Sequence, residues 1–124
     1  MAQEYSVLVI EDESDGAAVV TWMLKAQKIK STVVENGEAA IQQMQNSASD
    51  FNAMLVDLAL PGMDGFQLLK YFKGQAAPTI PMIAMTAFHT PELREKALSA
   101  GFDAYIPKPI EQAALAKALA SVLS

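Results

Sequence analysis

The sequence contains no cysteine and a single histidine in its 124 residues. The lack of cysteine excludes a disulfide framework and a thiolate metal site, and the shortage of histidine disfavours a zinc centre. A chain without cysteine suits a reducing compartment, and the first residues do not read as a signal peptide, so the cytoplasm is the expected location. The composition is 52% hydrophobic, which predicts a folded chain rather than a disordered one.

Positive charge is also scarce, with 9 lysine and arginine residues against 14 aspartate and glutamate residues and a net charge of −5. The chain has no basic stripe, so we do not expect this domain to bind nucleic acid directly. Its apolar runs are far shorter than the ~20 residues that cross a bilayer, and its first residues lack the basic segment of a signal peptide. The length suits one domain, and we assign residues 1–124 to it.

Short apolar segments alternate with amphipathic ones along the whole chain. Strands are expected near residues 5–10, 31–35, 51–56, 81–85 and 104–107. Helices are expected to be capped at Ser14 or Asp15, Asn36, Asp64 and Thr90, with a last helix near 111–123. This order predicts an α/β fold in which five helices flank a five-stranded parallel sheet on both faces. Trp22 is expected to pack within the first helix.

Polar side chains follow the expected strands at the point where each strand ends. Glu11 and Asp12 follow the first strand, Asp57 the third, Thr86 the fourth and Lys108 the fifth. Because the carboxyl ends of parallel strands meet at one edge of an open sheet, where such folds place their chemistry, these residues are expected to gather there.

The three acids in this set favour a magnesium-dependent phosphoacceptor site. Two carboxylates ~4 Å apart repel by about 4 kcal/mol at an effective dielectric constant near 20, so the cluster needs a cation or one of its members must take a proton. Ligands that are all oxygen favour Mg²⁺. A carboxylate such as that of Asp57 can attack phosphorus, and Thr86 and Lys108 can neutralise the oxygens of the resulting aspartyl phosphate.

With these residues in place, the chain resembles the receiver domain of two-component response regulators over nearly its whole length. The matching motifs are residues 9–13, Asp57 with 61–65, residues 85–87, and 101–105 running into Lys108 and Pro109. The resemblance implies a flavodoxin-like, doubly wound (βα)5 fold with strand order 2-1-3-4-5. It also implies a cis peptide bond between Lys108 and Pro109.

The resemblance assigns the metal ligands. Asp12 and Asp57 would bind Mg²⁺ directly, the backbone carbonyl of Ala59 would do the same, and Glu11 would act through water. Asp57 would be the phosphoacceptor for a histidine kinase or a histidine phosphotransfer protein.

The resemblance also implies a switch. Thr86 and Lys108 would contact the phosphoryl oxygens, and Tyr105 would turn inward when Thr86 moves. A downstream protein, or a second copy of the chain, would then bind the face formed by the last two helices and the last strand. The outer side of the last helix is unusually small and apolar at Ala113, Ala116 and Ala120.

The chain departs from the family pattern at a few positions. It lacks an arginine early in the first helix, and neither Ala59 nor Phe88 can ionise to activate water. We therefore expect a long-lived phosphorylated state, with Phe88 screening the phosphate. His89 is expected to be a surface residue without a role in catalysis.

Three rival functions are open to a chain of this pattern. A pseudo-receiver would use the same fold as an interaction module without phosphorylation. A phosphohydrolase would need a second acid at position 59, where the chain has alanine, and a flavin-binding protein would need a glycine- or hydroxyl-rich loop where Glu11, Asp12 and Glu13 stand. The sequence favours a receiver that catalyses its own phosphorylation and slow dephosphorylation and is not a conventional turnover enzyme.

Overall fold

Five strands and five helices alternate along the chain in the computed structural model, which describes residues 4–47, 50–75 and 80–123. Their bounds are β1 (Ser6–Ile10), α1 (Ser14–Ala26), β2 (Lys30–Val34), α2 (Gly37–Ser47), β3 (Ala53–Asp57), α3 (Gly65–Lys73), β4 (Met82–Thr86), α4 (Pro91–Ala100), β5 (Ala104–Pro107) and α5 (Gln112–Val122). The alternation expected from the sequence is confirmed. The sequence also predicts a polar loop at 46–50 and a turn-rich connection at 74–81. The helix α2 extends to Ser47, into the first of these segments, and residues 48–49 and 76–79 lie outside the described residues.

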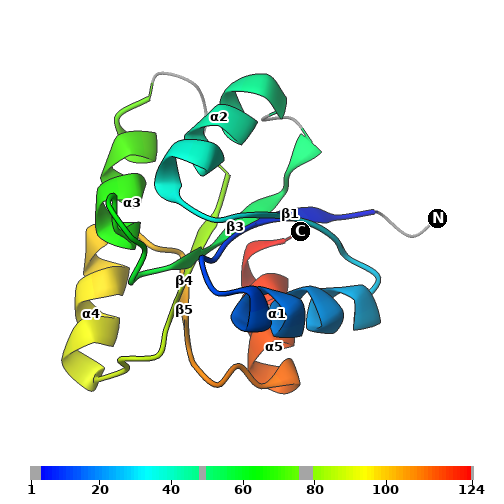
Figure 1. Cartoon of the computed structure of the whole chain (residues 1–124). Helices are drawn as coiled ribbons and strands as arrows, with labels where there is room; N and C mark the ends of the chain where they lie inside the picture. Colours follow the sequence, from blue (N-terminus) through cyan, green and yellow to red (C-terminus); the bar gives the residue numbers. More distant parts are fainter. Residues whose placement is uncertain (1–3, 48–49, 76–79, 124) are drawn as a thin grey trace.

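The strands form one parallel sheet in the order β2-β1-β3-β4-β5 (Figure 1). This is the order that the family resemblance implied. The order reverses between β1 and β3, so the chain runs outward in both directions from these two central strands. The carboxyl ends of β1, β3, β4 and β5 consequently lie side by side at one edge of the sheet.

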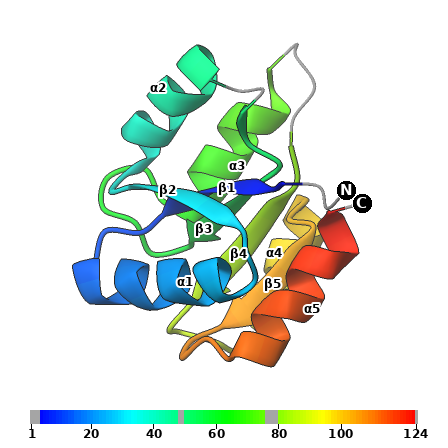
Figure 2. The ribbon, with the colours of Figure 1, turned by 90° about the vertical axis from the view of Figure 1, so that its right-hand side faces the viewer.

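Helices cover both faces of the sheet. Figures 1 and 2 show α1 and α5 together on one face and α2, α3 and α4 on the other. Alternate residues of each central strand point to opposite faces, so Leu8 joins one apolar core and Val9 joins the other. Every residue of β3 and β4 is buried, which explains why these strands read as continuous apolar runs rather than alternating ones.

Side-chain caps fix where several helices begin. Asp64 accepts a hydrogen bond from Gln67 N while the Gln67 side chain accepts one from Asp64 N, both at 2.9 Å. Asn36 and Thr90 accept equivalent bonds at 2.8 and 3.0 Å from residues three positions later. These caps satisfy backbone donors that the first turn of a helix leaves free, so the predicted starts of α2, α3 and α4 are confirmed.

Two predictions for α1 were wrong. The helix is capped at Glu13, without a side-chain hydrogen bond, rather than at Ser14 or Asp15. Trp22 is 69% exposed instead of packed. The buried residues of α1 include Val20 and Leu24, and Trp22 lies two positions from each, which places it about 200° around the helix on the solvent side.

Candidate functional site

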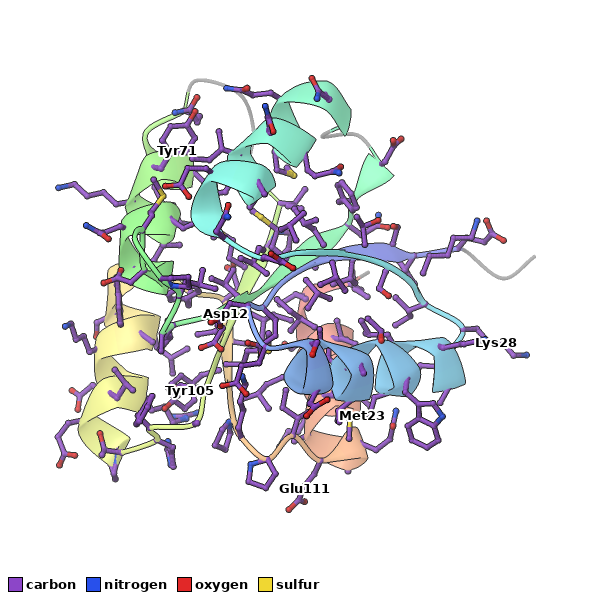
Figure 3. The ribbon with its side chains drawn as sticks, in the orientation of Figure 1. Asp12, Met23, Lys28, Tyr71, Tyr105 and Glu111 are labelled. Carbon is purple, nitrogen blue, oxygen red and sulfur yellow. The ribbon has the colours of Figure 1, made fainter. Side chains whose placement is uncertain are left out.

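The strand register brings Glu11 beside Asp57. Ile10 is the last residue of β1 and pairs with Val56 of β3, so Glu11, just beyond β1, and Asp57, the last residue of β3, stand at the same level. Asp12 comes next and is exposed, and Figure 3 shows it over the end of these strands. Glu11 is 1% exposed and Asp57 is 6% exposed, so two of the three acids are removed from water.

The three acids are close enough to share one cation. Glu11, Asp12 and Asp57 each offer a carboxylate oxygen, and these oxygens lie within 4.8 Å of one another. A set of oxygen ligands with one exposed member matches the preference of Mg²⁺, which binds through one or two carboxylates and keeps several waters. The residues present therefore fit a magnesium ion, with Asp12 on the open side.

Lys108 joins two of the acids from the end of β5. Its ammonium donates a hydrogen bond to Glu11 Oε1 and a second, at 2.9 Å, to Asp57 Oδ2. Burial lowers the pKa of Lys108, but the hydrogen bonds and charges of the two acids outweigh burial and leave that pKa raised above 10.5. Lys108 therefore stays charged at neutral pH and offsets part of the repulsion between the two acids.

Burial shifts the pKa of Glu11 in the opposite direction to that of Lys108. Desolvation raises its pKa, the hydrogen bond from Lys108 lowers it, and the neighbouring Asp57 raises it again, with a net rise above 4.5. Space for this buried carboxylate comes from Gly16 in α1, because a Cβ atom at that position would lie 2.9 Å from Glu11 Oε1.

A tight turn after β3 holds the other oxygen of Asp57. Ala59 N donates to Asp57 Oδ1 at 2.9 Å. The turn then leads to Gly65, where a Cβ atom would lie 2.8 Å from the backbone of Leu58, so a larger residue would push the turn away. The two carboxylate oxygens of Asp57 thus have separate partners, Ala59 and Lys108. The predicted metal contact of the Ala59 carbonyl stays a prediction.

Thr86 ends β4 beside this cluster. Its side chain is buried, and its hydroxyl accepts a hydrogen bond from Phe88 N at 3.0 Å. Its carbonyl accepts a bond from Lys108 N at 2.8 Å, which fixes the backbones of the two residues side by side. The hydroxyl retains its own proton to donate. The peptide bond between Lys108 and Pro109 is cis, as the resemblance implied.

Tyr105, within β5, has a partner that was not predicted from the sequence. His89 Nδ1 lies 2.9 Å from the Tyr105 hydroxyl oxygen. The sequence indicates this contact only indirectly, because predicting it requires knowing that the loop after β4 faces the neighbouring strand β5. Phe88, in the same loop, is 70% exposed, so the proposed screening of the phosphate by its ring stays a prediction.

Comparisons with known proteins agree with this geometry. Residues 7–120 match the family described as the response regulator receiver domain. The chain is 31% identical over 109 residues to the response regulator RppA of Synechocystis and 31% identical over 118 residues to the sensory transduction protein RegX3 of Mycolicibacterium smegmatis. These alignments cover 88% and 95% of the chain but 46% and 50% of those relatives, so the chain spans about half their length.

A solved structure extends the match to three dimensions. The response regulator receiver domain (CheY-like) from Methylobacillus flagellatus superposes with a TM-score of 0.82 at 26% identity, covering 97% of this chain and 99% of that one. Among the described residues, no helix is long and apolar enough to cross a membrane. Sequence motifs, strand order and family match together show that the chain belongs to the receiver domains of two-component response regulators.

Proposed function

We propose that Asp57 is the phosphoacceptor of a two-component phosphorelay. In this reaction an Asp57 carboxylate oxygen bonds to the phosphorus of a phosphohistidine on a histidine kinase or phosphotransfer protein. The P–N bond breaks, and the departing imidazole keeps the electron pair and takes up a proton. The observation that carries the proposal is the position of Asp57, which is 6% exposed at a strand end, beside two other acids and bonded to a lysine.

The neighbouring residues supply positioning and charge. Lys108 already bonds Asp57 Oδ2, and the same ammonium can follow a phosphoryl oxygen once it is attached. The Thr86 hydroxyl can donate to another oxygen from the adjacent strand. Mg²⁺, held by Asp12, Asp57 and the Ala59 carbonyl with Glu11 acting through water, would neutralise further negative charge on the transferred group.

The added charge is the basis of the switch. A phosphoryl group brings about −1.5 to −2 charges, and Thr86, Lys108 and the ring of Tyr105 are the groups expected to rearrange around it. The proposed output surface consists of α4, β5 and α5, where Ala113 and Ala120 are exposed. The partner would be a downstream protein or a second copy of the chain. The difference between its affinities for the active and inactive conformations sets how far the population shifts.

The pseudo-receiver is the weaker alternative. Glu11, Asp12, Asp57, Thr86 and Lys108 all retain side chains able to perform the proposed roles, and the first three converge within 4.8 Å. A module that did not use phosphorylation would not need this set. The composition without cysteine supports a cytoplasmic location, where the proposed donors act.

Intact-mass spectrometry tests the proposal. The chain is incubated with Mg²⁺ and acetyl phosphate, beside Asp57→Asn and the matched control Asp15→Asn, which removes an exposed acid from the first turn of α1. We expect one hydroxylamine-labile phosphoryl group on the wild type and on Asp15→Asn and none on Asp57→Asn. If the wild type remained unmodified while binding Mg²⁺, the pseudo-receiver would replace the proposal.

A further inference from the structure

The loop between β4 and α4 is joined to β5 by a side-chain contact that the proposed phosphoryl transfer does not use. His89 Nδ1 lies 2.9 Å from the hydroxyl oxygen of Tyr105, and the two rings are 5.4 Å apart at an interplanar angle of 51°. His89 is exposed, whereas Tyr105 is half-buried and packs against the core beneath α3 and α4. The hydrogen bond therefore holds the outer end of a ring whose body rests on the core.

The same short loop is held at its other end by Thr86. Phe88 N donates to the Thr86 hydroxyl at 3.0 Å, so the backbone just before His89 is bonded to the side chain expected to reach the phosphoryl group. His89 is three residues after Thr86, and three residues span at most about 10 Å of extended chain. A displacement of Thr86 is therefore expected to move His89 as well. A continuous line of contacts thus runs from Thr86 through the loop to His89 and then to Tyr105.

We propose that His89 is a positioning residue that holds Tyr105 in the position it has before Asp57 is phosphorylated. The contact thereby limits the fraction of molecules ready to accept a phosphoryl group. The inference rests on the proposed function of Asp57. Both partners can donate or accept a hydrogen bond, so the contact forms with either neutral tautomer of the imidazole. The contact stabilises one arrangement of the loop and ring, and phosphorylation must overcome it.

The expected effect is moderate. A single hydrogen bond between partly solvated groups changes an equilibrium by about twofold to tenfold. When a reaction proceeds from the competent fraction of a population, its apparent rate rises in proportion to that fraction. Loss of the contact is therefore expected to raise the rate constant of Asp57 phosphorylation by acetyl phosphate about twofold to tenfold.

Four variants separate the hydrogen bond from other effects. His89→Ala removes one partner, Tyr105→Phe removes the other and keeps the ring, and a double variant combines them. His89→Asn keeps a hydrogen-bonding atom the same number of bonds from Cα as Nδ1. We expect His89→Ala and Tyr105→Phe to be phosphorylated faster than the wild type. The double variant should be phosphorylated no faster than either single variant, and His89→Asn should resemble the wild type.

Gln42→Ala, which truncates an exposed side chain of α2, away from the proposed site and output surface, is the matched control and is expected to leave the rate unchanged. Equal rates in all variants, or single effects that multiply in the double variant, would overturn the role of His89. A second readout does not depend on phosphate, namely the NMR signals of ¹³C-labelled Tyr105 without a donor. These should shift more in His89→Ala than in His89→Asn, because both variants lose the neighbouring imidazole ring but only the first loses the hydrogen bond. Equal shifts in the two variants, or none in either, would also overturn the inference.

If the wild type takes no phosphoryl group, the proposed function fails, and the NMR comparison still decides whether His89 positions the ring. If phosphorylation occurs at rates that His89→Ala leaves unaltered, the proposed function stands and the role of His89 fails. The two failures are therefore distinguishable.

Discussion

Lys108 Nζ donates to Asp57 Oδ2 at 2.9 Å and also bonds Glu11, so one ammonium holds two buried acids together. The Lys108 side chain is 20% exposed, and those of its partners are 0% and 8% exposed. Removing one partner of a buried ion pair leaves uncompensated charge, so this contact carries consequences for both folding and metal binding.

Replacing Lys108 by methionine is expected to destabilise the metal-free protein by about 3 kcal/mol, because two buried carboxylates lose their counter-charge. Urea denaturation without divalent cations measures the change. Lys117→Met, at an exposed position of α5, serves as the control and should lie within about 0.5 kcal/mol of the wild type. A Lys108 variant as stable as its control would show that the acids do not depend on the ammonium.

The same substitution is expected to strengthen Mg²⁺ binding, since Lys108 and a divalent cation compete for the carboxylates of Glu11 and Asp57. Calorimetric titration with MgCl₂ gives the dissociation constants of both proteins. A ligand at 100 times its dissociation constant stabilises a fold by about 2.7 kcal/mol, so saturating Mg²⁺ should also recover much of the lost stability. Weaker binding by the variant would contradict this competition.

Gly16→Ala tests how Glu11 is accommodated. Alanine favours a helix by about 1 kcal/mol over glycine, but its Cβ here would lie 2.9 Å from Glu11 Oε1 and displace that carboxylate. We expect weaker Mg²⁺ binding and slower phosphorylation by acetyl phosphate. Gly74→Ala is the matched control, because a Cβ there meets backbone oxygens at an ordinary 3.5 Å. Equal losses in both variants would rule out the specific clash.

Tyr105 is expected to ionise at higher pH than an ordinary tyrosine. Burial raises its pKa above 10.0, although the charge of Arg94 acts in the opposite direction. Because the folded state holds the proton more tightly, the associated stability is complete below pH ~10 and is lost as the pH rises through the higher folded value. Tyrosinate absorbance at alkaline pH, compared with Tyr105→Phe, isolates this group. A Tyr105 component that titrates below the ordinary value would contradict the prediction.

The exposure of Trp22 has a spectroscopic consequence. It is the only tryptophan of the chain and is 69% exposed, so its emission should resemble that of indole in water and should be quenched efficiently by acrylamide. Trp22→Ala should change stability by no more than about 0.5 kcal/mol, since exposed positions contribute little packing. Blue-shifted emission protected from acrylamide would instead indicate that this face of α1 is covered in solution.

Local patterns were sufficient to predict the elements and the strand-end residues. Apolar runs of five or six residues mark the central strands because both faces of β3 and β4 are buried, and caps at Asn36, Asp64 and Thr90 mark where helices begin. These signals depend on neighbours within a few positions, so they can be recognised in the sequence without knowledge of the fold. The strand order came from the family resemblance and not from such signals.

The exposure of Trp22 follows from its position around α1 and not from its size. The stripe containing Val20 and Leu24 is the buried side of α1, and helical periodicity alone places Trp22 opposite it. The angular position of Trp22 around the helix axis, and not the size of its side chain, decides its exposure.

The sequence by itself determined that acids, a hydroxyl and an amine would stand at the ends of successive strands. Only the tertiary structure decided which of them touch. Lys108 meets Glu11 across 97 residues and Asp57 across 51, and His89 meets Tyr105 across 16. Contacts at such separations depend on strand order, register and the course of the loops, which arise from packing the whole sheet, whereas periodicity and capping act within a single turn or strand.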